Sequence, residues 1–411
     1  MSDVLLIGVD GGATEVKAHA AACDDLQRPT SFRLRAEAAA RVYPRPLGFS
    51  PMAVPEQLAQ RDAGDIRLSD GEIEQGRLWV EAAAQAVVEV AQQCGAKRAL
   101  VGMGMPGLKT PDGRGINTIN NGPRIPRYLE LLERMIAAAG VELASPVAAL
   151  GSDADYCGLG EEYAADGLFR DVQDAYYLGG GTGIADAMKL RGRLVPFDAA
   201  KPWIQKSWQM PSALGPTFEK LVSASSLNRV WGDLNVAAGI SPAADVASAL
   251  RGRRSAPETL HATGPRYPEV AAVRGDPLAA AWLDTAALVL AELIFERLWT
   301  IKNGRPPAPH RGEAYGKLNP DHEYRDVLLE RVIIGQRVGL IYADTQYRAV
   351  FAGKLDAYLA SFIAASGDAE LARTYLDSAT SALKPAFVRA SRLRAAPALG
   401  AAVAAVRALT A

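Results

Sequence analysis

The chain has 411 residues, of which 49% are hydrophobic, so it exceeds one ordinary domain core and indicates two or three globular domains. Its 45 basic and 46 acidic residues give a net charge of −1, which argues against nucleic acid as a main partner because the strong positive field of non-specific binders is lacking. The three cysteines stand far apart, no basic N-terminal region precedes an apolar run, and charges break the longer apolar stretches, so we expect a cytoplasmic protein without disulfides or a membrane span.

The first predicted elements are two strands around a glycine turn. Residues 4–9 form a short apolar, β-rich run that ends in Asp10, and residues 16–20 alternate as a second strand. An acid at the end of a strand can hold a hydrated Mg²⁺, and the glycines and threonine that follow it can approach phosphate oxygens. Taken alone, an ordinary hairpin turn is the simpler explanation.

The next part of the chain predicts an insertion followed by a β-α-β step. Four prolines and scattered charges over residues 41–75 indicate an extended, irregular insertion. A helix is expected over 78–93 and a strand over 98–103, which closes at a glycine-rich turn. The loop over 109–126 carries three asparagines, which suit either a polyhydroxylated ligand or tight turns.

A second candidate site lies in residues 152–194. A helix is expected over 154–163, so Asp153 stands at its first turn, either as a helix cap or as a carboxylate base. A strand over 174–178 then ends in a glycine turn at 179–183 and returns as a second strand. Because strand, turn and strand repeat the N-terminal pattern, the sequence indicates a duplicated fold with a phosphate site between the halves.

Three features downstream complete the pattern. A helix is predicted over 217–225 with Glu219 near its start, and a core helix over 276–301, where an aspartate cap precedes a proline. An apolar run over 327–334 closes at Gly335, whose backbone could lie against a nucleotide. An alanine-rich helix ends the chain.

Taken in order, these motifs resemble those of the ROK family of sugar kinases, within the superfamily that has the actin and hexokinase fold. Nine short motifs, each weak alone, carry the resemblance over nearly the whole chain. The first five are D-G-G-A-T at 10–14, G-M-P-G at 104–107, N-N-G-P-R-I-P at 120–126, S-D-A-D-Y-C-G-L-G-E at 152–161 and G-T-G-I-A-D-A-M at 181–188. The others are T-F-E-K-L-V-S at 217–223, G-D-P-L-A at 275–279, V-I-I-G-Q-R-V at 332–338 and A-L-G-A-A at 398–402.

The resemblance implies an α/β, two-domain actin-like ATPase (ribonuclease H-like) fold with the active site in the interdomain cleft. The expected domains are an N-terminal domain, a C-terminal domain and a terminal helix that returns towards the N-terminal domain, over 1–150, 151–396 and 397–411. The implied reaction is transfer of the ATP γ-phosphoryl group to a sugar hydroxyl, with Asp153 as general base and Mg²⁺ held through water by Asp10. The implied partners are ATP and a small sugar, and the chain is expected to form a homodimer.

Site residues follow from the same motifs. The implied nucleotide-binding residues are Asp10, Gly11, Gly12, Thr14, Gly181, Thr182, Gly183 and Gly335. The implied sugar-binding residues are Gly104, Asn121, Ser152, Asp153 and Glu219.

The sequence departs from the family mainly on the sugar side. The family's zinc motif is missing, because no His or Cys stands between the second phosphate motif and Glu219, so we expect no zinc. The acceptor must then be recognised differently, and the candidates are Lys201, Trp203 and Gln205. Three further replacements fall on implied contacts, namely Ser152 for Asn, Asp186 for Gly and Gln336-Arg337 for a glycine pair.

These departures leave alternatives to a sugar kinase of altered acceptor specificity. One is a catalytically impaired, ROK-fold protein that binds a sugar or effector and acts in regulation. Another is an ATPase of the related activase type, which the cysteine spacing disfavours because such proteins bring ligands for an iron–sulfur cluster.

Overall fold

The chain folds into two compact units in a computed structural model that describes residues 4–25, 31–44, 49–238 and 267–410. Unit 1 is Met1–Arg170 with Ala395–Ala411, and unit 2 is Asp171–Arg394. The division therefore falls after residue 170, whereas the predicted boundary follows residue 150. The reason is that helix α4 (Asp153–Tyr163), which begins with Asp153, packs against the C-terminal helix α15 (Ala396–Thr410) within unit 1.

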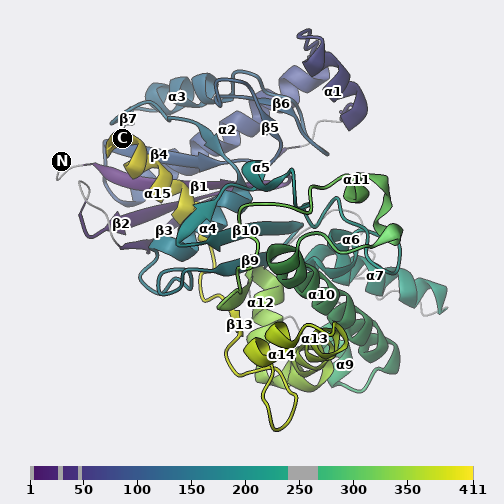
Figure 1. The fold of residues 1–411 in the computed structure, drawn as a ribbon. Coiled ribbons are helices and arrows are strands. Elements are labelled where there is room, and N and C mark those ends of the chain that lie inside the picture. The colour runs from purple at the N-terminus through teal and green to yellow at the C-terminus, as the bar shows by residue number, and fades with distance from the viewer. Residues whose placement is uncertain (1–3, 26–30, 45–48, 239–266, 411) are drawn as a thin grey trace. The chain divides into compact units, whose positions relative to one another are not determined.

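A mixed sheet forms the centre of unit 1, with the strand order β3-β2-β1-β4-β7 and with β8 also paired to β4 (Figure 1). Its strands are β1 (Leu5–Gly11), β2 (Glu15–Cys23), β3 (Phe32–Val42), β4 (Arg98–Gly104), β7 (Glu142–Leu143) and β8 (Leu150–Gly151). The predicted hairpin is confirmed, since β1 and β2 pair antiparallel. β3 extends the hairpin antiparallel, while β4 runs parallel to β1, β7 and β8.

Helices cover both faces of this sheet, as the alternation of side chains along β1 shows. Ile7 and Val9 belong to the core cluster that includes residues of α2 (Asp70–Gln93) and α3 (Tyr128–Ala138). The intervening Gly8 faces α15 instead, so closely that a Cβ atom there would lie 1.8 Å from the Ala398 carbonyl oxygen. A side chain at this position would push α15 off the sheet.

The segment predicted as an irregular insertion over 41–75 contains a helix and the first turns of another, which corrects that prediction in part. β3 reaches Val42, α1 spans Val54–Asp62, and α2 already begins at Asp70. Pro55 is compatible with a helix because it lies in the first turn, where an N–H group has no acceptor within the helix. Pro46, one of the four prolines, lies outside the described residues.

Unit 2 repeats the sheet of unit 1. Its order is β11-β10-β9-β12-β13, with antiparallel pairs along β11-β10-β9 and parallel pairs along β9-β12-β13. The strands are β9 (Ala175–Gly180), β10 (Ile184–Leu190), β11 (Arg193–Val195), β12 (Arg331–Gly335) and β13 (Val388–Ala390). The same order and senses as in β3-β2-β1-β4-β7 confirm the predicted duplication.

The core of unit 2 is built around α10 (Pro277–Asn303), which confirms the predicted central helix. Asp276 caps it by accepting hydrogen bonds from the N–H groups of Leu278 and Ala279 at 2.9 and 3.0 Å. The helix is long and apolar enough to cross a membrane, but it packs against α13, α9 and α6 as a core helix does (Figure 1).

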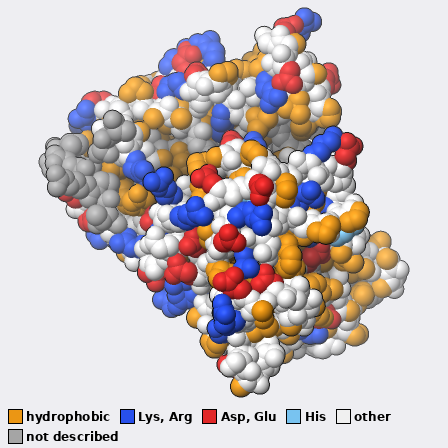
Figure 2. Space-filling model, in the orientation of Figure 1, with side chains coloured by type: hydrophobic (Ala, Val, Ile, Leu, Met, Phe, Trp, Pro, Cys, Tyr) orange, Lys and Arg blue, Asp and Glu red, His pale blue; other side chains and the backbone are white. Residues whose placement is uncertain are grey.

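Shorter helices complete unit 2. The predicted helix over 217–225 is interrupted, since α6 (Phe218–Val222) ends just before Ser223. The Ser223 hydroxyl then caps the next helix by accepting from the Ser226 N–H at 3.2 Å. The other α-helices among the described residues of unit 2 are α5 (Phe197–Ala200), α7 (Ala224–Ala237), α9 (Pro268–Val273), α11 (Gly312–Gly316), α12 (Gln336–Ala343), α13 (Gly353–Ala365) and α14 (Ala369–Tyr375). On the face shown in Figure 2, basic and acidic side chains are interspersed over the described residues.

Candidate active site

In unit 1, the ends of three parallel strands bring the predicted catalytic residues together. Asp10 near the end of β1 stands opposite Gly104 of β4, and Gly104 stands opposite Gly151 of β8. Asp153 follows Gly151 by two residues and begins α4. The carboxyl ends of parallel strands are where open α/β sheets bind ligands, so this edge is the candidate acceptor half-site.

The two carboxylates of this half-site interact. Burial and, to a smaller extent, the nearby Asp153 carboxylate raise the pKa of Asp10 to about 7, against the opposing effect of Lys17. Two carboxylates within electrostatic range of each other at a partly desolvated edge favour a cation or a proton beside them. Carboxylates with a strongly shifted pKa, such as Asp10, occur frequently at functional sites.

The environment of Asp153 favours a chemical role over helix capping. Ser152 occupies the N-cap position, and Asp153 is the first helical residue, with Oδ1 accepting a hydrogen bond from the adjacent Ala154 N–H at 3.0 Å. A capping side chain instead accepts from N–H groups two or three residues ahead. Both Ser152 and Asp153 are partly exposed and can be reached by a substrate.

The glycines of this edge have packing roles of their own. A Cβ atom at Gly11 would lie 1.9 Å from Sδ of Met105, and one at Gly104 would lie 2.9 Å from the ring of Tyr156. The N–H of Gly12 donates to the Glu15 carbonyl oxygen at 2.9 Å and thereby closes the turn that carries Thr14. Close packing therefore accounts for Gly11 and Gly104, and closure of the turn accounts for Gly12.

Two buried hydroxyls near Asp10 were not predicted. Tyr43 and Tyr128 are 3% and 0% exposed, and neither hydroxyl has a hydrogen-bond partner among the described residues. Burial raises the pKa of Tyr43, and the Tyr128 hydroxyl and Asp10 raise it further, which places the three groups within electrostatic range. Tyr43 lies in the segment predicted to be irregular, and no motif pointed to this cluster.

In unit 2, the glycine turn between β9 and β10 forms the candidate phosphate half-site. Gly181 N–H donates to the Gly183 carbonyl oxygen at 3.0 Å, so it closes the turn and leaves Thr182 exposed at the tip. The Gly181 carbonyl oxygen accepts from the Ser225 N–H at the start of α7 at 3.3 Å. The N–H groups of Thr182 and Gly183 are therefore the ones placed to meet a phosphate.

Glu219 lies at this turn. Its Oε2 accepts a hydrogen bond from the Ile184 N–H at 2.9 Å, and a Cβ atom at Gly183 would lie 2.6 Å from the same oxygen. The residue implied for sugar binding is thus brought to the second phosphate motif, where it fixes the strand that leaves the turn. It remains partly exposed.

Asp186, which replaces a glycine of the phosphate motif, points into the core of unit 2. It is 2% exposed and accepts hydrogen bonds from the Tyr176 hydroxyl at 2.5 Å and from the Ser207 hydroxyl and N–H at 2.6 and 3.0 Å. Arg297 of α10, itself fully buried, donates to Asp186 at 3.2 Å and to the Gln205 carbonyl oxygen at 2.8 Å. The carboxylate is therefore neutralised internally and is not directed at a phosphate.

The replacements in the nucleotide motif have different surroundings. Gln336 has a left-handed backbone (φ 55°), and its side chain lies over the glycine turn, where a Cβ atom at Gly181 would be 2.1 Å from its Oε1. Arg337 forms an ion pair with the buried Glu269 and stacks on Tyr267 at 4.3 Å. Gly335 packs against Tyr177, with 2.1 Å from a Cβ atom to its hydroxyl oxygen. The Gln336 side chain therefore restricts the access of a ligand to the glycine turn at 181–183.

The three candidates for acceptor recognition differ in their contacts within unit 2. Trp203 is 6% exposed and stacks on His322 at a centroid distance of 4.1 Å. Lys201 forms an ion pair with Asp198. The backbone carbonyl oxygen of Gln205 accepts from Arg297, whereas its buried side-chain Oε1 has no hydrogen-bond partner among the described residues. Trp203 is therefore a packing residue.

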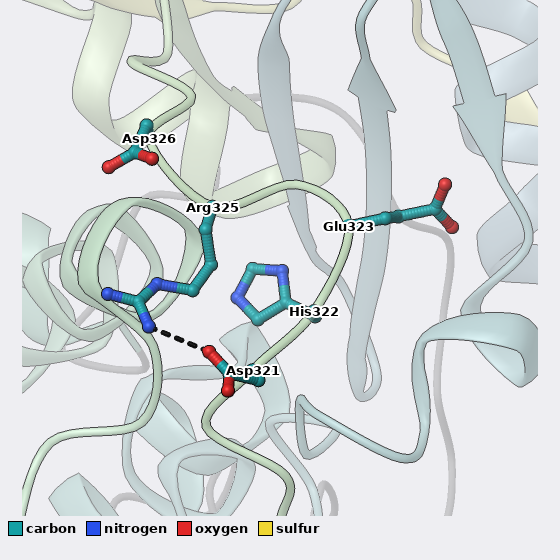
Figure 3. Close-up of a pocket in the computed structure, with 5 residues that line it drawn as sticks. All are labelled: Asp321, His322, Glu323, Arg325 and Asp326. Atoms are coloured by element: carbon teal, nitrogen blue, oxygen red, sulfur yellow. Dashed lines mark hydrogen bonds and ion pairs between the residues drawn. The ribbon is translucent and has the colours of Figure 1, made fainter.

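A pocket of about 510 Å³ lies in the loop before β12 and contains none of the predicted site residues (Figure 3). It is lined by Asp321, His322, Glu323, Arg325 and Asp326. Arg325 donates to Asp321 at 2.9 Å, and His322 bonds the Thr300 carbonyl oxygen at 2.9 Å. With three carboxylates and a paired arginine, the pocket is unsuited to phosphate.

The residues of the first half-site fit a hydrated Mg²⁺. Such an ion needs only one or two carboxylates and completes its shell with water and phosphate oxygens. Asp10, a partly desolvated carboxylate beside a second one, is a suitable donor. Within the described parts of the chain, no group of three or more His, Cys, Asp or Glu side chains could hold a metal ion.

The sequence matches no protein-family model and none of the curated proteins compared with it. Solved structures, in contrast, match along nearly the whole chain. A ROK family glucokinase from Streptomyces griseus, solved with glucose and AMPPNP, has a TM-score of 0.52 and 16% identity, covering 98% of this chain and 99% of its own.

Two further structures show the same similarity. The ROK hexokinase from Thermus thermophilus has a TM-score of 0.50 and 17% identity, covering 99% of each chain. A ROK family protein from Streptococcus pneumoniae TIGR4, solved with sucrose, has a TM-score of 0.52 and 14% identity, covering 99% of each chain. At such identities the similarity establishes the fold alone, and this chain has the actin-like α/β fold of the ROK sugar kinases.

Proposed function

We propose that this protein transfers the γ-phosphoryl group of ATP to a hydroxyl group of a sugar or sugar derivative. The observation that carries the proposal is the pair of interacting carboxylates, Asp10 and Asp153, at the carboxyl ends of three parallel strands. The pair lies in a fold shared with kinases, one of which was solved with glucose and AMPPNP.

Asp153 would act as the general base. As the acceptor hydroxyl oxygen attacks the γ-phosphorus, the bond to the bridging oxygen of ADP breaks and the hydroxyl proton passes to a carboxylate oxygen of Asp153. Its partly exposed position at the start of α4 gives the carboxylate access to a bound hydroxyl. Ser152 and Asn121 would supply hydrogen bonds to the other hydroxyls of the acceptor.

The phosphate groups would meet backbone donors and a cation. The N–H groups of Thr182 and Gly183 would donate to phosphate oxygens, since that of Gly181 already closes the turn. Asp10 would hold Mg²⁺ through water, and the ion, when bound, would offset charge on the transferring group. In such reactions, positioning and electrostatic stabilisation supply nearly all of the rate gain.

A second candidate is a ROK-fold protein that binds a sugar or effector and has lost phosphoryl transfer. The observation that favours it is Gln336, whose side chain lies over the glycine turn at the position where the family has a glycine. Weak nucleotide binding with intact sugar binding would follow from this arrangement.

A coupled ADP-release assay with Mg-ATP and a panel of hexoses, amino sugars and acetylated sugars tests the proposal. We expect acceptor-dependent ADP release with at least one sugar of the panel. Calorimetry on the same samples separates the alternative, because sugar binding without Mg-ATP binding would favour the regulatory protein. No ADP release and no sugar binding across the panel would overturn both.

A further inference from the structure

We propose that the helical segment 52–72 positions the acceptor loop 117–126, with Gln57 and Arg124 as the positioning residues. The inference rests on the proposed function, in which Asn121 of this loop contacts the acceptor. It gives the insertion, whose role the sequence did not indicate, a part in substrate recognition. α1 lies beside β6 (Ile116–Thr118), at the start of the loop (Figure 1).

Gln57 of α1 holds the loop on the N-terminal side of Asn121. Its side chain is fully buried, and its carboxamide pairs with the backbone of Ile119 as a neighbouring strand would. Oε1 accepts from the Ile119 N–H at 2.8 Å, and Nε2 donates to the Ile119 carbonyl oxygen at 3.0 Å. Nε2 also donates to the Met52 carbonyl oxygen at 2.7 Å, which fixes the amide plane.

Arg124 holds the loop on the other side. It is 1% exposed, and its guanidinium makes a bidentate pair with Glu72 of α2, with both N···O distances at 2.8 Å. The same group donates to Oε1 of Gln60 at 2.7 Å and to the Arg67 carbonyl oxygen at 2.8 Å. Glu72 also accepts from the backbone N–H of Arg124 at 2.9 Å, so side chain and main chain are held together.

Between these two anchors, the tip of the loop is exposed but constrained. Gly122 lies against the indole of Trp79, where a Cβ atom would be 2.7 Å from the ring. Asn120 and Asn121 are exposed, and Asn121 has a left-handed backbone (φ 61°). The polar tip is therefore presented to solvent in one conformation by contacts that are themselves buried.

The chemistry of the anchors favours positioning over stability as their role. A buried ion pair is a weak source of net stability because desolvation offsets the Coulombic gain, but it defines geometry well. An acceptor that must meet a base within hydrogen-bond distance is sensitive to displacements of about 1 Å, which can cost on the order of 100-fold in rate. Loss of the Gln57 hydrogen bonds should therefore slow the reaction with the acceptor and leave the binding of ATP unchanged.

The test uses the full-length protein with Gln57→Ala and, as a matched control, Gln85→Ala. Gln85 is exposed on α2, and its carboxamide bonds the Glu81 carboxylate. For Gln57→Ala we expect faster amide hydrogen exchange at 117–122, unchanged exchange in β1, and a kcat/KM for the acceptor lowered about 10- to 100-fold, with the KM for ATP within about two-fold of wild type. Gln85→Ala should match wild type in all four measurements.

The outcomes separate this inference from the proposed function. Faster exchange at 117–122 with an unchanged kcat/KM for the acceptor would overturn the positioning role while leaving the kinase proposal intact. A parallel rise in the KM for ATP, or equal loss of exchange protection in β1, would show a structural effect only and would also overturn it. A wild-type protein without acceptor turnover or sugar binding would remove the proposed function and this inference with it.

Discussion

Arg297→Met is the substitution whose effect the structure defines most sharply. The guanidinium is fully buried beside two carboxylates, at 3.2 Å from Asp186 and 2.7 Å from Glu296. It also donates to the Gln205 carbonyl oxygen and the Ser207 hydroxyl, so it joins α10 to β10 and to the segment that precedes α6. Methionine fills most of the same volume but removes the charge and every donor.

The expected cost is large because the carboxylates remain. Asp186 keeps the bonds from Tyr176 and Ser207 but loses the arginine that neutralised it. Glu296 keeps the bonds from Thr300 and Tyr315 and a longer ion pair with Arg311 at 3.6 Å. Removing one partner of a buried ion pair costs about 3–5 kcal/mol. With a denaturant dependence of about 1–3 kcal/mol per molar urea, the midpoint of unfolding of unit 2 should fall by more than about 1 M.

Urea unfolding followed by tryptophan fluorescence measures this effect, because five of the six tryptophans lie in unit 2, namely Trp203, Trp208, Trp231, Trp282 and Trp299. Arg373→Met is the control, since its side chain is 79% exposed and its ion pair with Glu370 is long at 3.8 Å. The double variant with Asp186→Asn should lose less than the sum of the two single variants, because the residues are in contact. A midpoint for Arg297→Met equal to that of Arg373→Met would refute the reasoning.

Three further predictions concern the half-sites. The raised pKa of Asp10, about 7 against 3.8, means that the folded state binds more protons in this range, so unit 1 should lose on the order of 2–4 kcal/mol as pH rises from 4 to 8. Asp10→Asn should abolish that loss, which thermal unfolding measured across this pH range tests. The same pH dependence in Asp10→Asn as in wild type would contradict the prediction. Tyr128→Phe should leave thermal stability unchanged or raise it by about 1 kcal/mol, because the buried hydroxyl lacks a described partner; a clear loss would reveal one. Gln336→Gly should lower the Kd for Mg-ATP in calorimetry, because it opens the glycine turn and relieves a left-handed backbone; weaker binding would show that the amide contacts the nucleotide.

Features with local signals were predicted well from the sequence. The hairpin around Asp10 and the cap of α10 depend on residues within a few positions of each other, and both are confirmed. The duplicated sheet follows from the repeated strand, turn and strand. The resemblance to the sugar kinases rested on the order of its motifs, because no single one is specific.

Features that depend on distant partners were missed. Asp186 replaces a glycine of the phosphate motif, but the direction of its side chain depends on Arg297, its ion-pair partner 111 positions further on. The bonds from Arg124 to Glu72 and from Gln57 to Ile119 likewise span 52 and 62 positions. Proline in α1 suggested a loop because composition does not reveal that it stands in the first helical turn.

The central claim, that Asp153 is the base of a sugar kinase, is tested most directly by the kcat of Asp153→Asn at saturating ATP and acceptor. Asparagine preserves the shape of the side chain but cannot take up the proton. The account predicts a kcat about 10²- to 10⁴-fold lower than wild type, with the Kd for Mg-ATP unchanged. A kcat within about three-fold of wild type would contradict it.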